Sequence, residues 1–286
     1  MGETSVVTDP GGYVERFARP GLMGVVSAAY IQRAGAAAPT SSRHIPNGSV
    51  ELRCEPGASP RVVGPLTRVR TEELGAGTSV VGVRLRPGAA PALLGLPASE
   101  IVDEVLDLGE LWGAAGERLA ERVADAGSDD AALTVLEQAL EERLASASRP
   151  DALVMEAVRG LMPWRGGEVG EVAVRLNISE SQLRRRTQAA VGLPPKVLQR
   201  MLRFQGFLAL VQEAIARGES PRHEGIAALA ADVGFADQPH LNRECLRLTG
   251  STTAAFIAQT MSACSCGHDH AASYRPLLSA RRPGAV

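Results

Sequence analysis

The chain has 286 residues and a formal net charge of −2, and its length suits about two domains. It has no apolar run near the ~20 residues of a membrane-spanning helix, and its N-terminus lacks the basic and apolar regions of a signal peptide. Four unevenly spaced cysteines are too few for a disulfide framework. These features exclude the membrane and secreted classes and predict a cytoplasmic protein.

The N-terminal region predicts a small antiparallel β unit. Residues 1–20 are rich in Gly and Pro, so we expect irregular structure there. Runs rich in β-branched residues predict strands at 22–31, 49–54, 61–64 and 79–86, with a tight turn at Asn47-Gly48. In the last run, Val81, Val83 and Leu85 alternate with Gly82, Arg84 and Arg86, which predicts a strand with one buried face.

Helical patterns follow these strands. Residues 97–100 predict the start of a short helix, and residues 114–126 and 129–145 predict two longer ones. The last helix carries leucines spaced 3, 4 and 4 apart, which form a narrow apolar seam of Leu133, Leu136, Leu140 and Leu144. The seam either packs against its own domain or forms the two-fold contact of a homodimer.

Residues 145–150, ASASRP, predict a linker because they are small and polar and end in a proline. The tail after Gln259 loses helical periodicity. We therefore expect a β-rich domain with trailing helices at 1–148, a helical domain at 149–260 and a flexible tail at 261–286. The first half is acidic and the second mildly basic, as suits a regulatory domain joined to a DNA-binding one.

The stretch from Glu224 to Phe256 predicts a helix-turn-helix. Ile226, Ala230 and Val233 would form the inner face of its first helix, and Gly234 permits the left-handed backbone that ends it. Asp237 can cap the second helix.

A second, weaker copy lies upstream at residues 170–191. Asn177 makes its turn, Ser179 caps its second helix and Gly192 ends that helix. Pro194-Pro195 then opens a long helix to about Ala216, which would hold the two units at a fixed distance.

The second helices leave polar side chains pointing outward. Arg pairs with guanine and Asn or Gln with adenine, while further Arg residues hold phosphates. The candidate DNA-binding residues are Ser181, Gln182, Arg184, Arg185, Arg186, Gln238, His240, Asn242, Arg243 and Arg247. Taken singly, each also fits a solvated polar face.

The region from Asp151 to Gln259 resembles the AraC/XylS DNA-binding domain, most specifically in the GFxDQxHxxR motif that runs from Gly234 to Arg243. The resemblance implies two helix-turn-helix units joined by a long helix, and a transcription regulator that binds promoter DNA and RNA polymerase. An activator is the expectation, with a repressor as the alternative. The base-facing positions that it implies are Ser181, Arg184, Arg185, Gln238, His240, Asn242 and Arg243. This chain departs from the family at Thr187, Leu241 and Cys245, where phenylalanine is usual, and at Thr253, where proline is usual.

The N-terminal half resembles, less specifically, the small cupin-derived β domain found ahead of AraC-type domains in actinobacterial-type regulators. The motifs that carry this resemblance are IPNGSVEL, VVGP, GVRLRPGAA and LLGLPASEIVDEVLDLGELWG, with Asn47 where aspartate is usual. The expected fold class is therefore α+β, a β-rich domain followed by an all-α double helix-turn-helix domain. A small-molecule effector is the expected partner of the β-rich domain.

Enzymatic chemistry is not indicated. A metal-dependent cupin needs several His ligands and a carboxylate, and the N-terminal half has only His44. The chain also lacks a phosphate-binding glycine loop, a nucleophile elbow and an HExxH motif. We predict a sequence-specific regulator controlled through its N-terminal domain.

The tail contains CSCGHDH, which places Cys264, Cys266, His268 and His270 within seven residues. Thiolates and imidazoles suit Zn(II) or Cu(I), although the spacing is tighter than in structural zinc sites. The alternative function is therefore a metal- or thiol-redox-responsive regulator that senses through this tail.

Overall fold

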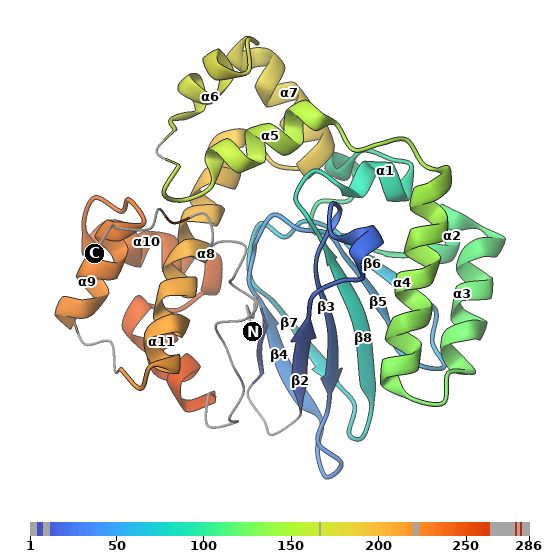
Figure 1. Cartoon of the computed structure of the whole chain (residues 1–286). Coiled ribbons are helices and arrows are strands. Elements are labelled where there is room, and N and C mark those ends of the chain that lie inside the picture. The colour runs from blue at the N-terminus through green and yellow to red at the C-terminus, as the bar shows by residue number, and fades with distance from the viewer. Residues whose placement is uncertain are drawn as a thin grey trace.

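The computed structural model describes residues 5–7, 12–165, 167–219, 223–263, 278 and 281. A β-rich N-terminal half precedes a helical C-terminal half (Figure 1). The strands are β1 Ser5–Val7, β2 Tyr13–Arg16, β3 Val26–Arg33, β4 Thr40–His44, β5 Glu51–Cys54, β6 Arg61–Val63, β7 Arg70–Leu74, β8 Ser79–Leu85 and β9 Val105–Asp107.

The helices fall into two groups. Those of the N-terminal half are α1 Ala90–Leu94, α2 Leu108–Trp112, α3 Ala114–Ala124 and α4 Asp129–Ser146, with 3-10 turns η1 Pro20–Leu22 and η2 Ala98–Glu100. Those of the C-terminal half are α5 Ala152–Leu161, α6 Val169–Arg175, α7 Glu180–Val191, α8 Pro195–Ala216, α9 His223–Asp232, α10 Gln238–Thr249 and α11 Thr253–Ala263. No helix in the described ranges has the length and apolarity to cross a membrane.

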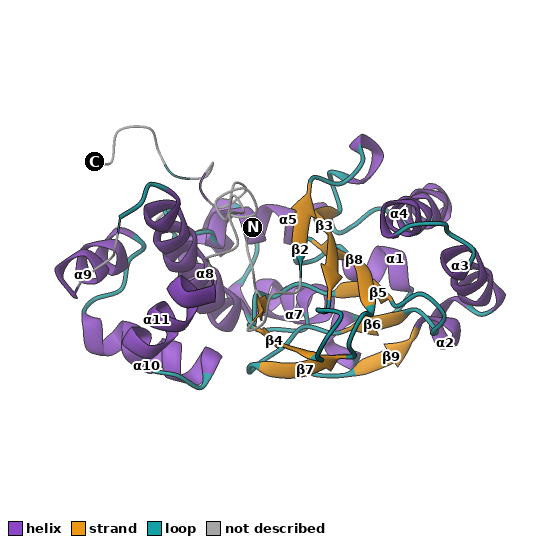
Figure 2. Ribbon diagram, turned by 90° about the horizontal axis from the view of Figure 1, so that it is seen from below, coloured by secondary structure: helices purple, strands orange, loops and turns teal. Residues whose placement is uncertain are grey.

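The strands form two antiparallel sheets, of order β1-β4-β7 and β2-β3-β8-β5-β6-β9. Helices α1, α3 and α4 cover one face of the six-stranded sheet, and the three-stranded sheet lies on its other side (Figure 2). The fold is α+β, as predicted, with β-rich and helical parts in the expected order.

The helix-covered face of the six-stranded sheet is apolar. It packs against α4, whose Leu133, Leu136 and Leu140 are fully buried, while Leu144 packs against the same core. Removing one such leucine side chain typically costs ~2–5 kcal/mol. The leucine seam is therefore buried in the core of its own half of the chain. It is not available to a second subunit, so the interpretation of the seam as a homodimer contact is wrong.

The other face of this sheet is polar, and its charged groups are paired. Arg84 is only 6% exposed, and its guanidinium lies 2.7 Å from Glu15 Oε1 and 3.0 Å from Glu51 Oε1. Burial would raise the pKa of Glu51, but Arg84, His44 and Arg53 together lower it to about 2. The prediction that β8 has one buried face is wrong, because these ion pairs compensate for burying charge on its second face.

Two further expectations are wrong. Residues 1–20 are not all irregular, and the sheets contain more strands than were predicted. Residues 13–16 form β2, and β4, β7 and β9 were not predicted. The sequences of β4 and β7, TSSRH and RTEEL, lack apolar runs because both strands contribute to a polar layer on the second face of the six-stranded sheet. We call this the polar layer. Residues 97–100 give only the 3-10 turn η2, whereas α3 and α4 lie where longer helices were predicted.

Candidate nucleic-acid interface

The upstream helix-turn-helix consists of α6 and α7. Asn177 adopts the left-handed conformation (φ 54°) between them. The Ser179 side chain accepts a hydrogen bond from the Gln182 backbone N–H, and the Gln182 side chain accepts one from Ser179, which completes a capping box. Gly192 ends α7 with φ 84°. The predicted turn, cap and terminus of this unit are all confirmed.

The downstream unit consists of α9 and α10. Gly234 ends the first helix with φ 86°, and Gly250 ends the second with φ 70°. The Asp237 carboxylate accepts a hydrogen bond from the backbone N–H of His240 at 2.6 Å and so caps α10. The positions of Gly234 and Asp237 match the predicted ones, whereas the end of α10 at Gly250 was not predicted.

Helix α8 joins the two units. Its 22 residues span about 33 Å at 1.5 Å per residue, close to the ~34 Å of one DNA turn. Phe204 and Phe207 are fully buried on this helix, and Phe235 and Phe256 of the second unit pack against them. The long helix therefore belongs to the core of the domain, so its length is held rigid by packing.

The exposed face of α7 presents the predicted side chains to solvent. Ser181, Gln182, Arg184, Arg185 and Arg186 are all exposed. Gln182 is engaged in the capping box, and Arg186 pairs with Asp151 at 2.7 Å. Across the described ranges, Arg184 and Arg185 have no ion-pair partner, so both guanidinium groups are available.

The predicted side chains of α10 are more engaged within the protein. The Asn242 side-chain oxygen accepts a hydrogen bond from Thr253 N at 3.0 Å, and the His240 ring lies edge-on to Phe235 with centroids 5.2 Å apart. Arg247 pairs with Glu244 at 2.6 Å, and Gln238 is half-buried. Arg243 is exposed and, in the part of the chain that the structure covers, forms no ion pair.

The positions that depart from the family are core positions. Thr187, Leu241 and Cys245 are fully buried, and Thr253 is buried at the start of α11. Burial raises the pKa of the Cys245 thiol, and it raises that of the Cys54 thiol to about 12. These departures therefore change packing and leave the exposed face intact.

A contact between the two halves of the chain was missed by sequence reasoning. Arg43, on β4, donates to the backbone oxygen of Thr249 and to Gln259 Oε1 at 2.9 Å, with Ser251 Oγ 3.4 Å away. These acceptors lie at the C-terminal end of α10 and on α11. Two residues along the chain, Ile45 is buried in the core of the C-terminal half. Gly48 has the positive φ (75°) predicted for Asn47-Gly48, but β4 and β5 on its two sides belong to different sheets. No local pattern indicates what this segment packs against.

The predicted metal ligands Cys264, Cys266, His268 and His270 lie outside the described residues, so the Zn or Cu site stays a prediction. Within the described ranges, no group of three or more His, Cys, Asp or Glu side chains is arranged to hold a metal ion.

Comparisons with known proteins separate the two halves of the chain. Residues 15–107 match a family described as a domain of unknown function (DUF6597), and residues 172–259 match a helix-turn-helix domain. No curated protein matches the chain.

Solved structures of ToxT from Vibrio cholerae are similar over most of the chain. The O395 structure is 10% identical with a TM-score of 0.40, covering 90% of this chain and 97% of that one. ToxT bound to an unsaturated fatty acid, from strain SCE256, is 12% identical with a TM-score of 0.37, covering 89% and 95%. These likenesses are too distant to carry an argument about function.

Proposed function

Because the chain belongs to the AraC family of DNA-binding transcription regulators, we propose that it binds specific promoter sequences through α7 and α10 under the control of its N-terminal half. The N-terminal and helical parts would act as the regulatory and DNA-binding domains expected at 1–148 and 149–260. A homodimer, contact with RNA polymerase, activation and a cytoplasmic location belong to this proposal as expectations.

The observation that carries the proposal is the set of free arginines on the two capped helices. Arg184 and Arg185 on α7, and Arg243 on α10, are exposed and without ion-pair partners among the described residues. Guanidinium groups in this state pair with guanine edges or hold phosphates. We assign base contacts to Arg185 and Arg243, with Ser181, Gln238 and His240 beside them, and phosphate contacts to Arg186 and Arg247.

Control by the N-terminal half is supported by the contacts of β4. Arg43 places a positive charge at the C-terminal end of α10, where unpaired carbonyl groups and the helix dipole favour it. A ligand of the N-terminal half that favours one arrangement of this contact would shift the DNA affinity.

The test is selection of duplexes from a random pool by the full-length protein. We expect a defined sequence to be enriched, with an affinity that falls steeply as salt rises because phosphate contacts release counterions. Arg185→Ala should cost ~1–3 kcal/mol in binding and relax the preference at one base pair.

The matched control is Arg159→Ala, which removes an exposed arginine of α5 outside both recognition helices. Its affinity for the selected duplex should equal that of the parent protein. Failure to enrich any sequence, or equal losses in the two variants, would refute the assignment.

A further inference from the structure

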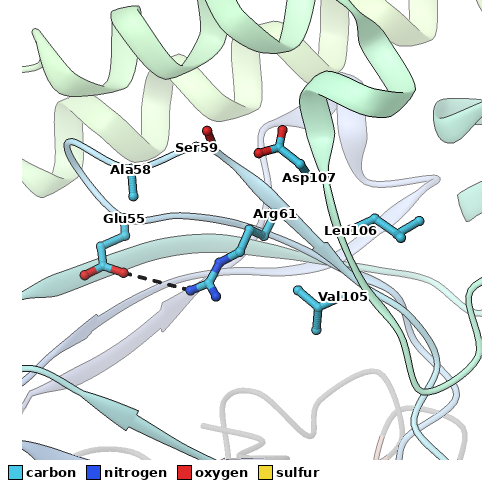
Figure 3. A pocket seen from close by; sticks show the side chains of 7 residues that line it. All are labelled: Glu55, Ala58, Ser59, Arg61, Val105, Leu106 and Asp107. Atoms are coloured by element: carbon cyan, nitrogen blue, oxygen red, sulfur yellow. Dashed lines mark ion pairs between the residues drawn. The ribbon is translucent and has the colours of Figure 1, made fainter.

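A cavity of about 370 Å³ opens at the edge of the polar layer, beside the β5–β6 turn and β9 (Figure 3). The hollow is open to solvent on one side, and its volume is that of sites that take small molecules. The side chains that line it are Glu55, Ala58, Ser59, Arg61, Val105, Leu106 and Asp107.

Arg61 gives the cavity an anion-binding group. Its nearest carboxylate oxygens belong to Glu72, at 3.7 Å, and Glu55, at 3.9 Å, and both distances exceed a hydrogen bond. No hydrogen bond to the Arg61 side chain is formed by the described residues. Its N–H groups are therefore available for the bidentate pairing that guanidinium makes with a carboxylate.

Carboxylates give the cavity a second, opposite preference. Glu55 and the Arg61 guanidinium point toward one another, whereas the Asp107 carboxylate is directed away from them (Figure 3). One Asp107 oxygen accepts from the Gly109 backbone at 2.7 Å, while the other has no partner in the described ranges. A plain anion would be repelled by these carboxylates and a plain cation by Arg61. A ligand that carries both an ammonium and a carboxylate group complements both.

The cavity is joined to the buried polar layer through Glu72. This carboxylate pairs with Arg61 on one side, and with Arg53 and His44 Nε2 on the other, the latter at 3.3 Å. Burial would raise the pKa of Glu72, but hydrogen bonds from His44 and Arg53 lower it below the usual range. Buried Arg53 Nε has no partner in the described part of the chain, so this network has one donor left that a rearrangement could satisfy.

The strands extend this connection to the DNA-binding half. Glu72 lies on β7, which pairs with β4 in the register Ser42 with Glu72 and Arg43 with Thr71. Arg43 on β4 holds the end of α10. A ligand that draws Arg61 away from Glu72 would thus act on the strand that carries Arg43.

We infer that the Arg61 cavity binds a small zwitterion of the free amino acid class, and that its binding changes the affinity of α10 for DNA. The carboxylate of the ligand pairs with Arg61, its ammonium group pairs with Glu55, and its apolar part contacts Val105 and Leu106. The regulatory half of this inference rests on the proposed function, whereas the binding half does not.

The experiment measures the thermal unfolding midpoint of the full-length protein with free amino acids added singly, and with acetate or methylammonium as probes of one charge. At saturation, at least one amino acid should raise the midpoint by roughly 5 °C, while neither single-charge probe should. The shift should persist in Arg122→Gln, a control of matched exposure on α3, and disappear in Arg61→Gln. No shift with any amino acid, or a shift that survives in Arg61→Gln, overturns the site.

Two further measurements keep the outcome clear. Should Arg61→Gln lower the midpoint without ligand, Glu55→Gln replaces it, because that variant retains Arg61 and must also lose the shift.

The second measurement tests the coupling to DNA binding. The stabilising amino acid should change affinity for the selected duplex by roughly 5- to 150-fold. A thermal shift with unchanged duplex affinity overturns the coupling. Failure of the parent protein to bind any selected duplex overturns the proposed function and leaves the thermal test of the site standing.

Discussion

The two helix-turn-helix units share their turns and caps but differ in how the N-terminal half contacts them. Helix α7 meets η2 through close packing at its end, where a Cβ added to Gly192 would lie 2.9 Å from the backbone oxygen of Ala98. Helix α10 is instead held by the hydrogen bonds of Arg43. Steric packing of this kind has one arrangement, whereas a hydrogen-bonded contact can open and close. On the proposed function, we therefore expect a fixed DNA contact from the first unit and an adjustable one from the second.

Their exposed faces differ in the same sense. Arg184 and Arg185 are free of ion-pair partners on α7 among the described residues, whereas on α10 the Asn242 oxygen and Arg247 are engaged within the protein. If both units bind DNA as proposed, the second would exchange more internal contacts for DNA contacts than the first, in which Arg186 would have to leave Asp151.

A double-mutant cycle sharpens this comparison and should give the largest effect. With Arg43 replaced by Ala, the further change Arg243→Ala should cost ~1–3 kcal/mol, or roughly 5- to 150-fold in duplex affinity. In the parent protein the same change should cost less, because α10 is held at its C-terminal end. Fluorescence anisotropy with the selected duplex measures all four proteins.

Arg185→Ala is the internal control of this cycle, since α7 makes no contact with Arg43 among the hydrogen bonds described. Its cost should be equal in both backgrounds. If Arg243→Ala costs the same with and without Arg43, the two units do not differ as we infer.

The caps of the two recognition helices test whether the units are alike in stability. Ser179→Ala and Asp237→Ala should each lower the free energy of unfolding by ~1 kcal/mol, because each leaves an N–H at a helix start without its partner. Urea denaturation measures both. Ser181→Ala, two residues into the exposed face of α7, is the control and should have little effect; an equal loss there would contradict the role of the caps.

The smallest effect concerns Cys245, a reporter buried inside α10. Burial raises the pKa of its thiol and that of Cys54, so neither should react with iodoacetamide in the native protein near neutral pH. Arg43→Ala should speed the labelling of Cys245 but not that of Cys54, because the contacts that are lost lie at the end of α10 and on α11. Mass spectrometry of labelled peptides measures this, and equal acceleration at Cys54 would indicate general unfolding instead.

The helix-turn-helix units could be predicted because their turns and helix ends depend on residues close together in the sequence. Asn177, Gly192, Ser179, Asp237 and Gly234 each satisfy a requirement of the nearest turn or cap. The N-terminal half was predicted only in part. Buried Arg84, Glu51 and Arg53 look like surface residues in a sequence, because their burial depends on partners far along the chain.

Long-range packing explains the remaining differences. The leucine spacing of α4 predicts an apolar face but not which surface covers it. The hydrogen bond from Arg43 to Gln259 joins residues that lie 216 positions apart in the chain. Such a contact leaves no periodic trace in the sequence.

The burial of Ile45 limits how freely the halves of this protein could be exchanged during evolution. Ile45 comes from the N-terminal half, yet it is 1% exposed and sits in the same cluster as Leu198 and Phe204. Gln205 strengthens the junction by donating to the backbone oxygen of Pro46 at 3.0 Å. A chimera that joins another N-terminal half at residues 145–150 would lack the Ile45 side chain and leave a cavity in the core of the helical half. Recombination would therefore favour N-terminal halves whose β4–β5 loop carries an apolar side chain equivalent to Ile45. The loop and the core residues that it contacts should then change together among descendants.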